Sequence, residues 1–401
     1  MPGIDGGTLR AWRRSRGWDV PEVARQLRRA ARDAGVDIAA SSGLIRMIYA
    51  WERGDHALSE RYELLYRALG LGASRRPGQQ PGSAPSADRG TLSRSRLDRF
   101  SAAQLDELIH LLDDQWHALV RTDNLLGPRH ALEGVRDQLG MIEILLRTVR
   151  PPARHQVLQL AARYAESAAW LYQDSGDLPG SRYWTGRSME WALEAGDRLM
   201  ISWVLYRRAE HAAADGDAAA VAGLAAAARR EGGDLPDPML AVILQQEAHA
   251  HALDRAEAAC LAALDQAYER AASPDDPGDA SGGHGSFCTP AYVEMQRGRC
   301  WLRLGRPANA AAALENAIQA LPPVYRRDRG VALSALGAAC AAIGEPVQAA
   351  TAAAQALDVA RDAGSERIVN MVIPVATALA PYSHLEAVAG LHEALAETRG
   401  A

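Results

Sequence analysis

Residues 44–69 read LIRMIYAWERGDHALSERYELLYRAL. Apolar side chains recur every three or four residues up to Trp51, which predicts a helix with one buried face. Gly54 then stands where the end of a helix favours glycine. An apolar stripe resumes after the break, so we expect two amphipathic helices in this stretch. The stripe of the second helix consists of Tyr62, Leu65 and Leu69.

Two further helices are predicted upstream of this stretch. Residues 8–17 carry an apolar stripe and end on Gly17. Residues 19–22 read DVPE, which begins a helix with a capping Asp, Pro in the first turn and Glu three residues after the cap. The buried stripe of this helix is predicted at Val23, Ala24 and Leu27. Residues 29–41, rich in Ala, are then expected to form an elongated turn before the next helix.

The region around residues 8–70 resembles the XRE-type (Cro/C1-like) helix-turn-helix regulators of high-GC actinobacteria. The resemblance rests on three motifs, Trp51-Glu52-Arg53-Gly54, Ser59-Glu60-Arg61-Tyr62 and Leu65-Tyr66-Arg67-Ala68-Leu69-Gly70. Many of these regulators carry the same elongated turn and continue into a tetratricopeptide-like helical array. The resemblance implies a transcriptional regulator that binds double-stranded DNA as a homodimer.

In such a domain the helix that begins near residue 41 enters the major groove, and its outward side chains reach the bases. Arg46 is suited to a bidentate contact with guanine, and Tyr49 to a base or a phosphate. The start of the helix favours phosphate. Arg53 is expected to contact phosphate or to pair with Glu52. The predicted DNA-binding residues are Ser41, Ser42, Arg46, Met47, Tyr49 and Arg53.

Charge is distributed unevenly along the chain. Residues 1–76 contain 14 Arg against 9 Asp and Glu, whereas the net charge of the whole chain is −5. A basic N-terminal segment followed by an acidic remainder favours phosphate contact at the N-terminal end alone. The surplus is modest, so the charge by itself does not establish DNA binding.

Composition excludes several other classes of protein. Strands have little support because few segments alternate apolar and polar residues, which indicates an all-α protein. No apolar run approaches the roughly 20 residues that cross a bilayer, and no secretion signal is evident.

The four cysteines are widely spaced, which indicates a reduced, cytoplasmic protein. His249, His251, His284 and Cys288 lack the spacing of a metal site. With no catalytic motif, we expect neither an enzyme nor a cofactor.

The chain divides into four predicted segments. A helix-turn-helix domain is expected over residues 1–72 and a Pro-, Gly- and Ser-rich flexible linker over residues 73–96. Amphipathic helices over residues 97–152 are predicted to connect these to the remainder. Residues 153–401 are predicted to form a tetratricopeptide-like α-solenoid that senses a ligand or partner and dimerises.

A repeat supports the solenoid. Breaks that begin with Gly separate Ala-rich helices at residues 176, 216, 305 and 344, so that two of the intervals are 40 (176 to 216) and 39 (305 to 344). The gap of 89 residues between the middle breaks fits two repeats and a Pro- and Gly-rich insertion at residues 273–287. The period exceeds the ~34 residues of the standard tetratricopeptide repeat.

Aromatic residues concentrate in the first repeats, where Trp and Tyr can line a ligand pocket. The predicted ligand-binding residues are Trp170, Trp184, Trp191, Trp203, Arg187 and Arg207. The competing interpretation is that these aromatic residues form the core between helices. The effector would be a small molecule or a peptide. The alternative function is a tetratricopeptide-like interaction scaffold whose N-terminal domain does not bind DNA.

Overall fold

The computed structural model describes residues 4–16, 18–71, 100–271 and 283–400. Within these ranges all regular structure is helical, which confirms the predicted all-α class. The predicted linker at residues 73–96 and the helix end at Gly17 lie outside the described residues. So does most of the insertion at residues 273–287.

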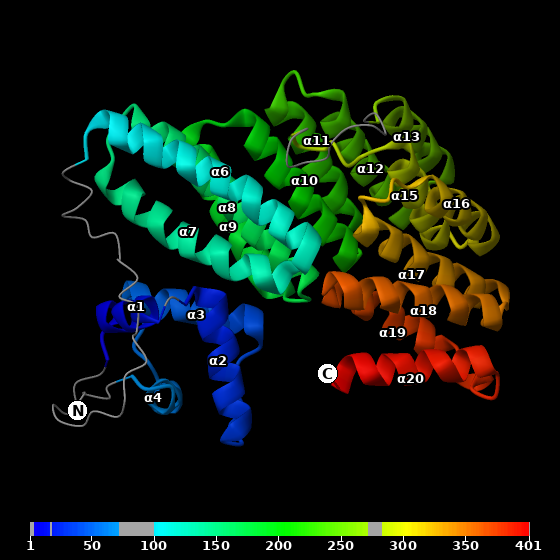
Figure 1. Cartoon of the computed structure of the whole chain (residues 1–401), viewed down its shortest axis with the longest axis horizontal. Coiled ribbons are helices and arrows are strands. Elements are labelled where there is room, and N and C mark those ends of the chain that lie inside the picture. The colour runs from blue at the N-terminus through cyan, green and yellow to red at the C-terminus, as the bar shows by residue number, and fades with distance from the viewer. Residues whose placement is uncertain (1–3, 17, 72–99, 272–282, 401) are drawn as a thin grey trace. The chain divides into compact units, whose positions relative to one another are not determined.

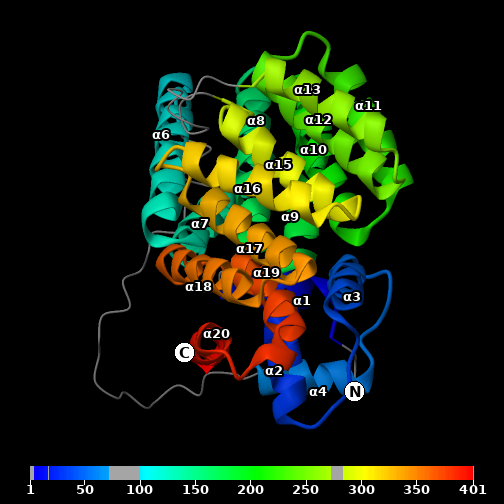
Figure 2. The same cartoon turned by 90° about the vertical axis from the view of Figure 1, so that its right-hand side faces the viewer.

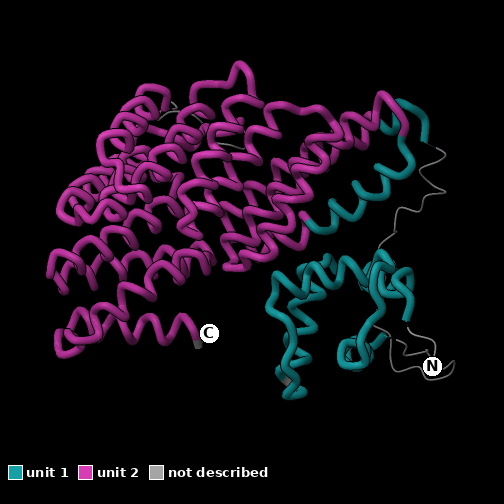
Figure 3. The backbone as a smooth tube through the Cα atoms, turned by 180° about the vertical axis from the view of Figure 1, so that it is seen from behind, with its two compact units in different colours: residues 1–105, 136–149 teal, residues 106–135, 150–401 magenta. Residues whose placement is uncertain are grey.

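Two compact units make up the chain (Figure 3). The first consists of residues 1–105 and 136–149, and the second of residues 106–135 and 150–401.

Four helices form the N-terminal part of the first unit, α1 (Gly6–Ser15), α2 (Val20–Asp33), α3 (Ser41–Arg53) and α4 (Glu60–Ala68). The start of α2 is as predicted, because the Asp19 carboxylate accepts a hydrogen bond of 2.7 Å from the backbone N–H of Glu22. The helices pack around one apolar core. Its fully buried members include Leu9, Val23, Leu27, Leu44, Ile48, Tyr62 and Tyr66.

The predicted elongated turn over residues 29–41 is wrong in extent. Helix α2 continues to Asp33, and α3 already begins at Ser41, so the connection is residues 34–40. Ala has the highest helix propensity, and Ala31 continues the buried stripe of Ala24 and Leu27 at helical spacing. Part of the segment 29–41 therefore lengthens α2, and only residues 34–40 form the connection.

The second unit consists of stacked helix pairs (Figures 1 and 2). It includes most of α6 (Ala102–Leu126) and the start of α7 (Pro128–Thr148). The pairs are α8 (Ala153–Asp174) with α9 (Leu178–Ala195), α10 (Arg198–Asp215) with α11 (Ala218–Gly232), α12 (Asp237–Leu253) with α13 (Glu257–Glu269), α15 (Pro290–Arg303) with α16 (Pro307–Ala320), and α17 (Arg326–Ile343) with α18 (Pro346–Ala363). The elements α19 (Glu366–Ala378), η1 (Ala380–Tyr382) and α20 (Glu386–Gly400) follow. This arrangement is an α-solenoid.

The turns inside the pairs explain the repeat. Glycine occupies the left-handed conformation at the four predicted breaks, where a residue with a Cβ atom would be strained. The turn missing from the 89-residue gap lies between α12 and α13 at Arg255, which adopts a φ of 60° without being glycine. The gap therefore contains the two expected repeats, although no glycine marks the boundary between them.

The first helices of the pairs form a closed circuit. In order along the chain α8, α10, α12, α15, α17 and α19 each contact the next, and α19 also contacts α8. The second helices of the pairs take no part in this closing contact. Numerous alanines are fully buried between the helices, which lets neighbouring backbones approach closely. In the described ranges no helix has the length and apolar character needed to cross a membrane.

Candidate functional sites

Helix α3 has one face in the core of its domain and one face open. Leu44 and Ile48 are fully buried, and Trp51 is 4% exposed. Trp51 packs against Tyr62 of α4, with ring centres 4.8 Å apart. The buried face therefore fixes the orientation of the helix and leaves its other face available.

Glu52 ties α3 to α1. Its carboxylate accepts two hydrogen bonds from Arg13, from Nε at 2.6 Å and from a terminal nitrogen at 2.8 Å. Arg10 donates to the backbone carbonyl of Glu52 at 2.8 Å. This bidentate pair is largely shielded from water, because the side chains of Glu52 and Arg13 are 6% and 14% exposed. It therefore holds the end of α3 against α1.

The predicted pairing of Arg53 with Glu52 is wrong. Successive residues of a helix point about 100° apart, so Glu52 faces α1 while Arg53 faces outward. Arg53 donates instead to Asp55, at 2.7 and 2.9 Å, and its guanidinium lies 4.9 Å from the centre of the Tyr49 ring.

The structure places the predicted DNA-binding residues along the open side of α3. Ser42, Arg46 and Arg53 are exposed, while Ser41, Met47 and Tyr49 are half-buried. The Ser41 hydroxyl accepts a hydrogen bond of 2.8 Å from Arg28 of α2. No contact within the described residues tests whether these side chains bind DNA.

A cavity of about 250 Å³ lies in the second unit. Most of its lining comes from α6, α8, α10, α15, α17 and α19, with Val135 of α7 and Ala363 at the end of α18. Phe287 from the segment before α15 and Val324 and Tyr325 from the segment before α17 complete it. Its wall is rich in aromatic rings: Trp116, Trp170, Trp203, Tyr206, Phe287, Tyr292 and Tyr325. The inner helices of the solenoid therefore surround a site with the size and lining of a small-molecule pocket.

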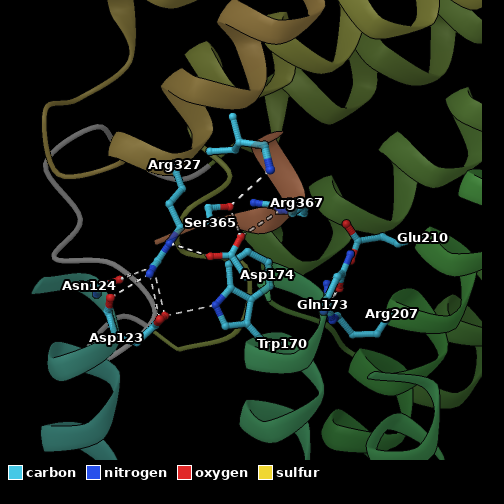
Figure 4. Close-up of polar contacts among 11 residues, drawn as sticks. Asp123, Asn124, Trp170, Gln173, Asp174, Arg207, Glu210, Arg327, Ser365 and Arg367 are labelled. Carbon is cyan, nitrogen blue, oxygen red and sulfur yellow. Dashed lines mark hydrogen bonds and ion pairs between the residues drawn. The ribbon is translucent and has the colours of Figure 1, made fainter. Parts of the chain in front are cut away.

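An ion cluster centred on Asp174 borders the cavity (Figure 4). Asp174, at the end of α8, is fully buried and forms ion pairs of 3.0 Å with Arg327 and 3.1 Å with Arg367. The Ser365 hydroxyl donates to the same carboxylate at 2.7 Å. These contacts join the first helix pair to α17 and α19, close to where the circuit of inner helices closes.

Arg327 also binds Asp123 of α6. Its two terminal nitrogens donate to the Asp123 carboxylate at 2.8 and 3.0 Å, and one of them donates to the backbone carbonyl at 2.7 Å. Burial raises the pKa of Asp123, and the charge of Arg327 opposes that rise. One guanidinium thus joins α6, α8 and α17.

Two guanidiniums, those of Arg207 and Arg367, lie near the Trp170 ring at the cavity wall (Figure 4). Its ring centre is 4.8 Å from Arg367 and 5.5 Å from Arg207, and its N–H donates to Asp123 at 3.2 Å. Arg207 is nearly buried and pairs with Glu210 and, at 3.3 Å, with Glu166. Burial raises the pKa of Glu166 and is opposed by the charge of Arg207. In this part of the wall the Trp170 N–H already has an acceptor, and the Arg207 guanidinium already has carboxylate partners.

Asp328 differs from these carboxylates. It lines the cavity in the first turn of α17 and makes no hydrogen bond or ion pair with any residue of the described part of the chain. Burial raises the pKa of Asp328 to about 6, against the opposing charges of Arg367 and Arg327.

Three of the six predicted ligand residues line the cavity, Trp170, Trp203 and Arg207. The other three, Trp184, Trp191 and Arg187, do not line it because they belong to α9, the outer helix of its pair. Trp184 and Trp191 are buried between helices, and the Arg187 guanidinium lies 4.3 Å from the centre of the Trp191 ring. The competing interpretation, a core role for the aromatic residues, fits Trp184 and Trp191, while Arg187 pairs with Glu190.

Sequence reasoning missed Asp123, Asp174, Arg327, Asp328 and Arg367. They lie in helices far apart in the sequence, with Asp123 and Arg327 alone 204 residues apart, so no local spacing connects them. The one available signal was the charged run Arg326-Arg327-Asp328-Arg329 at the start of a helix, which reads more simply as a solvated helix end.

Other candidate chemistry is limited within the described ranges. No group of three or more His, Cys, Asp or Glu is placed to hold a metal ion there. The four cysteines are buried and free. His249 is buried and bonded to Gln296 at 2.9 Å and to Arg303 at 2.6 Å.

No protein-family model matches the chain, and neither a curated protein nor a solved structure matches it. The resemblance to XRE-type regulators therefore stays a prediction from the sequence.

Proposed function

We propose that the protein is a cytoplasmic, sequence-specific DNA-binding transcriptional regulator whose α-solenoid senses a ligand. The observation that carries the proposal is the two-sided construction of α3. One side is fixed by Leu44, Ile48 and the Glu52–Arg13 pair, while Arg46 stands on the open side. A rigid helix that presents an exposed Arg is suited to reading guanine in the major groove.

Charge supports the same role. The arginine surplus of residues 1–76 favours phosphate, and the acidic remainder discourages contact with DNA elsewhere. The cavity gives the solenoid a place for an effector. An effector shifts DNA affinity only if it binds one conformation of the protein more tightly than another.

We further propose that the regulator acts as a homodimer, because repressor-type domains generally bind two half-sites about one helical turn apart. Sedimentation equilibrium checks this directly. The expected mass is twice the 43.0 kDa of one chain. The proposal is contradicted if the free protein sediments as a monomer at micromolar concentration and also binds DNA as a single chain.

Fluorescence anisotropy tests the DNA-binding function. The full chain is titrated into labelled duplex from upstream of its own gene and into a scrambled duplex, between 50 and 300 mM salt. Preference for the upstream duplex, with log affinity falling linearly against log salt, supports the proposal. Equal affinity for both duplexes, or no binding at 50 mM salt, would refute it and favour the interaction scaffold.

A further inference from the structure

The charges around the cavity are paired with one exception. Each guanidinium that lines the cavity already has a carboxylate partner, since Arg207 pairs with Glu166 and Glu210, and Arg327 with Asp123 and Asp174. Arg367 pairs with Asp174, and Arg326 with Asp362. Among the described residues that line the cavity, Asp328 is the one carboxylate with no guanidinium in contact. Figure 4 shows the pairs that Arg327 and Arg367 form with Asp123 and Asp174. Asp328 therefore lacks a cation in direct contact and feels only the more distant charges of Arg367 and Arg327.

A second carboxylate lies in the neighbourhood of Asp328. Its charge and that of Glu210 both act on Tyr292, another lining residue, so two carboxylates lie near one ring. Glu210 is already paired with Arg207, so a neutral or anionic occupant would leave only the charge of Asp328 without a partner in contact, which is costly. A cationic occupant offsets it.

The aromatic wall adds a second, independent observation. The Trp203 and Tyr206 ring centres are 4.9 Å apart, as are those of Phe287 and Tyr292, and Trp203 and Phe287 are 6.3 Å apart. A cation within about 6 Å of an aromatic ring centre is attracted to the ring face, most strongly where water is excluded. One face of Trp203 is already stacked on His284, with ring centres 4.7 Å apart, so the attraction falls to the remaining ring faces. The same wall already holds two guanidiniums against Trp170.

Trp203 also has unused hydrogen-bonding capacity. The residue is 5% exposed, and its N–H lies near the Glu166 carboxylate without reaching hydrogen-bonding geometry. A buried donor without an acceptor is unusual in a folded protein. This N–H needs an acceptor on the occupant, and an ammonium group has none, so the donor does not bear on the sign of the occupant's charge.

We propose that the cavity binds a compact organic cation, an amine or quaternary ammonium, with its charge beside Asp328 and its apolar part against the rings of Trp203, Phe287 and Tyr292. The volume of about 250 Å³ suits a small amine rather than a folded polypeptide segment. The inference rests on the proposed sensing role of the solenoid and names the class of effector.

Isothermal titration calorimetry of the full chain at pH 7.5, without DNA, tests the proposal. The cations are 2-phenylethylamine, tryptamine and tetraethylammonium. Neutral 2-phenylethanol and anionic 3-phenylpropionate have related apolar parts and serve as matched probes. We expect 2-phenylethylamine to bind at least tenfold more tightly than the alcohol, and the anion to show no binding.

Variants locate the site. Asp328→Asn should weaken 2-phenylethylamine at least tenfold and change the alcohol less than threefold. Asp265→Asn, an exposed carboxylate paired with Arg297 at 2.8 Å and outside the cavity, should change neither. If Asp328→Asn does not fold, Phe287→Leu replaces it and should weaken the amine about threefold to tenfold by removing one ring.

Three outcomes would overturn the proposal: equal binding of amine and alcohol, tighter binding of the anion, or no binding of any cation at 10 mM. Because DNA is absent from the titration, its result is distinguishable from the DNA-binding test. Amine binding without DNA binding would refute the proposed regulator and leave the cation site standing.

Discussion

The Nε atom of Arg327 lies 3.0 Å from a carboxylate oxygen of Asp174, and this ion pair joins α17 to α8 across more than 150 residues of sequence. Asp174 is fully buried, and the Arg327 side chain is 11% exposed. Such a pair is expensive to desolvate and still more expensive to break, because the remaining charge stays buried. The solenoid therefore depends on both partners where its inner helices close their circuit.

The first prediction concerns this closure. Arg327→Ala leaves Asp123 and part of the Asp174 carboxylate without a counter-charge, so we expect a loss of about 3–5 kcal/mol in the free energy of unfolding. Arg326→Ala is the matched control, because Arg326 is 55% exposed and pairs at the surface with Asp362. The control should cost less than about 1 kcal/mol. Urea unfolding followed by tryptophan fluorescence measures both, and equal costs would contradict the account.

A second prediction concerns pH. The pKa of Asp328 is raised to about 6 in the folded protein, against about 3.9 for an Asp in an unfolded chain. The folded state thus binds more protons between these values, so the contribution of Asp328 to stability falls as pH rises from 4 to 6. Relative to Asp328→Asn, the wild type should lose roughly 1–3 kcal/mol over this range. Parallel pH profiles of the two proteins in thermal unfolding would show this prediction to be wrong.

A third prediction concerns the anchoring of α3. Glu52→Ala removes the carboxylate that Arg13 binds and leaves a largely buried guanidinium unpaired, which should cost about 3 kcal/mol. Asp55→Ala breaks the exposed pair with Arg53 and should cost less than about 1 kcal/mol. Hydrogen exchange of the α3 amides reports the difference. Unchanged protection of α3 in Glu52→Ala would show that the pair does not hold the helix.

The fourth prediction concerns Arg46, the exposed arginine on the open side of α3. Arg46→Ala should remove about 1–3 kcal/mol of discrimination between the preferred and the scrambled duplex, because a bidentate contact to guanine is lost. Arg67→Ala, on α4 and paired with Glu63, serves as the control and should leave the preference unchanged. Anisotropy titrations at one salt concentration measure both variants. Equal effects of the two substitutions would argue against the proposed orientation of α3.

Much of the fold follows from local rules that the sequence displays. The Asp19 cap, the apolar stripe of α3 and the glycine breaks of the solenoid each depend on residues within a few positions of one another. The boundary at Arg255 escaped these rules because a non-glycine residue adopts the left-handed conformation there. The end of α2 was misplaced because an Ala-rich segment suits both a helix and a connection.

The candidate sites were predictable to different degrees. The open face of α3 follows from helical spacing alone, so the exposure of Arg46 could be expected. The cavity could be found only in part, through Trp170, Trp203 and Arg207, because aromatic content marks a region but not which side of a helix pair faces inward. Asp123, Asp174 and Arg327 meet through tertiary packing between distant helices, and local spacing carries no signal of it.

The most direct test of the regulatory function is selection of bound sequences from a random duplex library by the full chain, with Arg46→Ala in parallel. We expect enrichment of a guanine-containing motif in two half-sites about one helical turn apart, with the preference at that guanine relaxed in the variant. Recovered sequences that match the starting library for the wild type would contradict it.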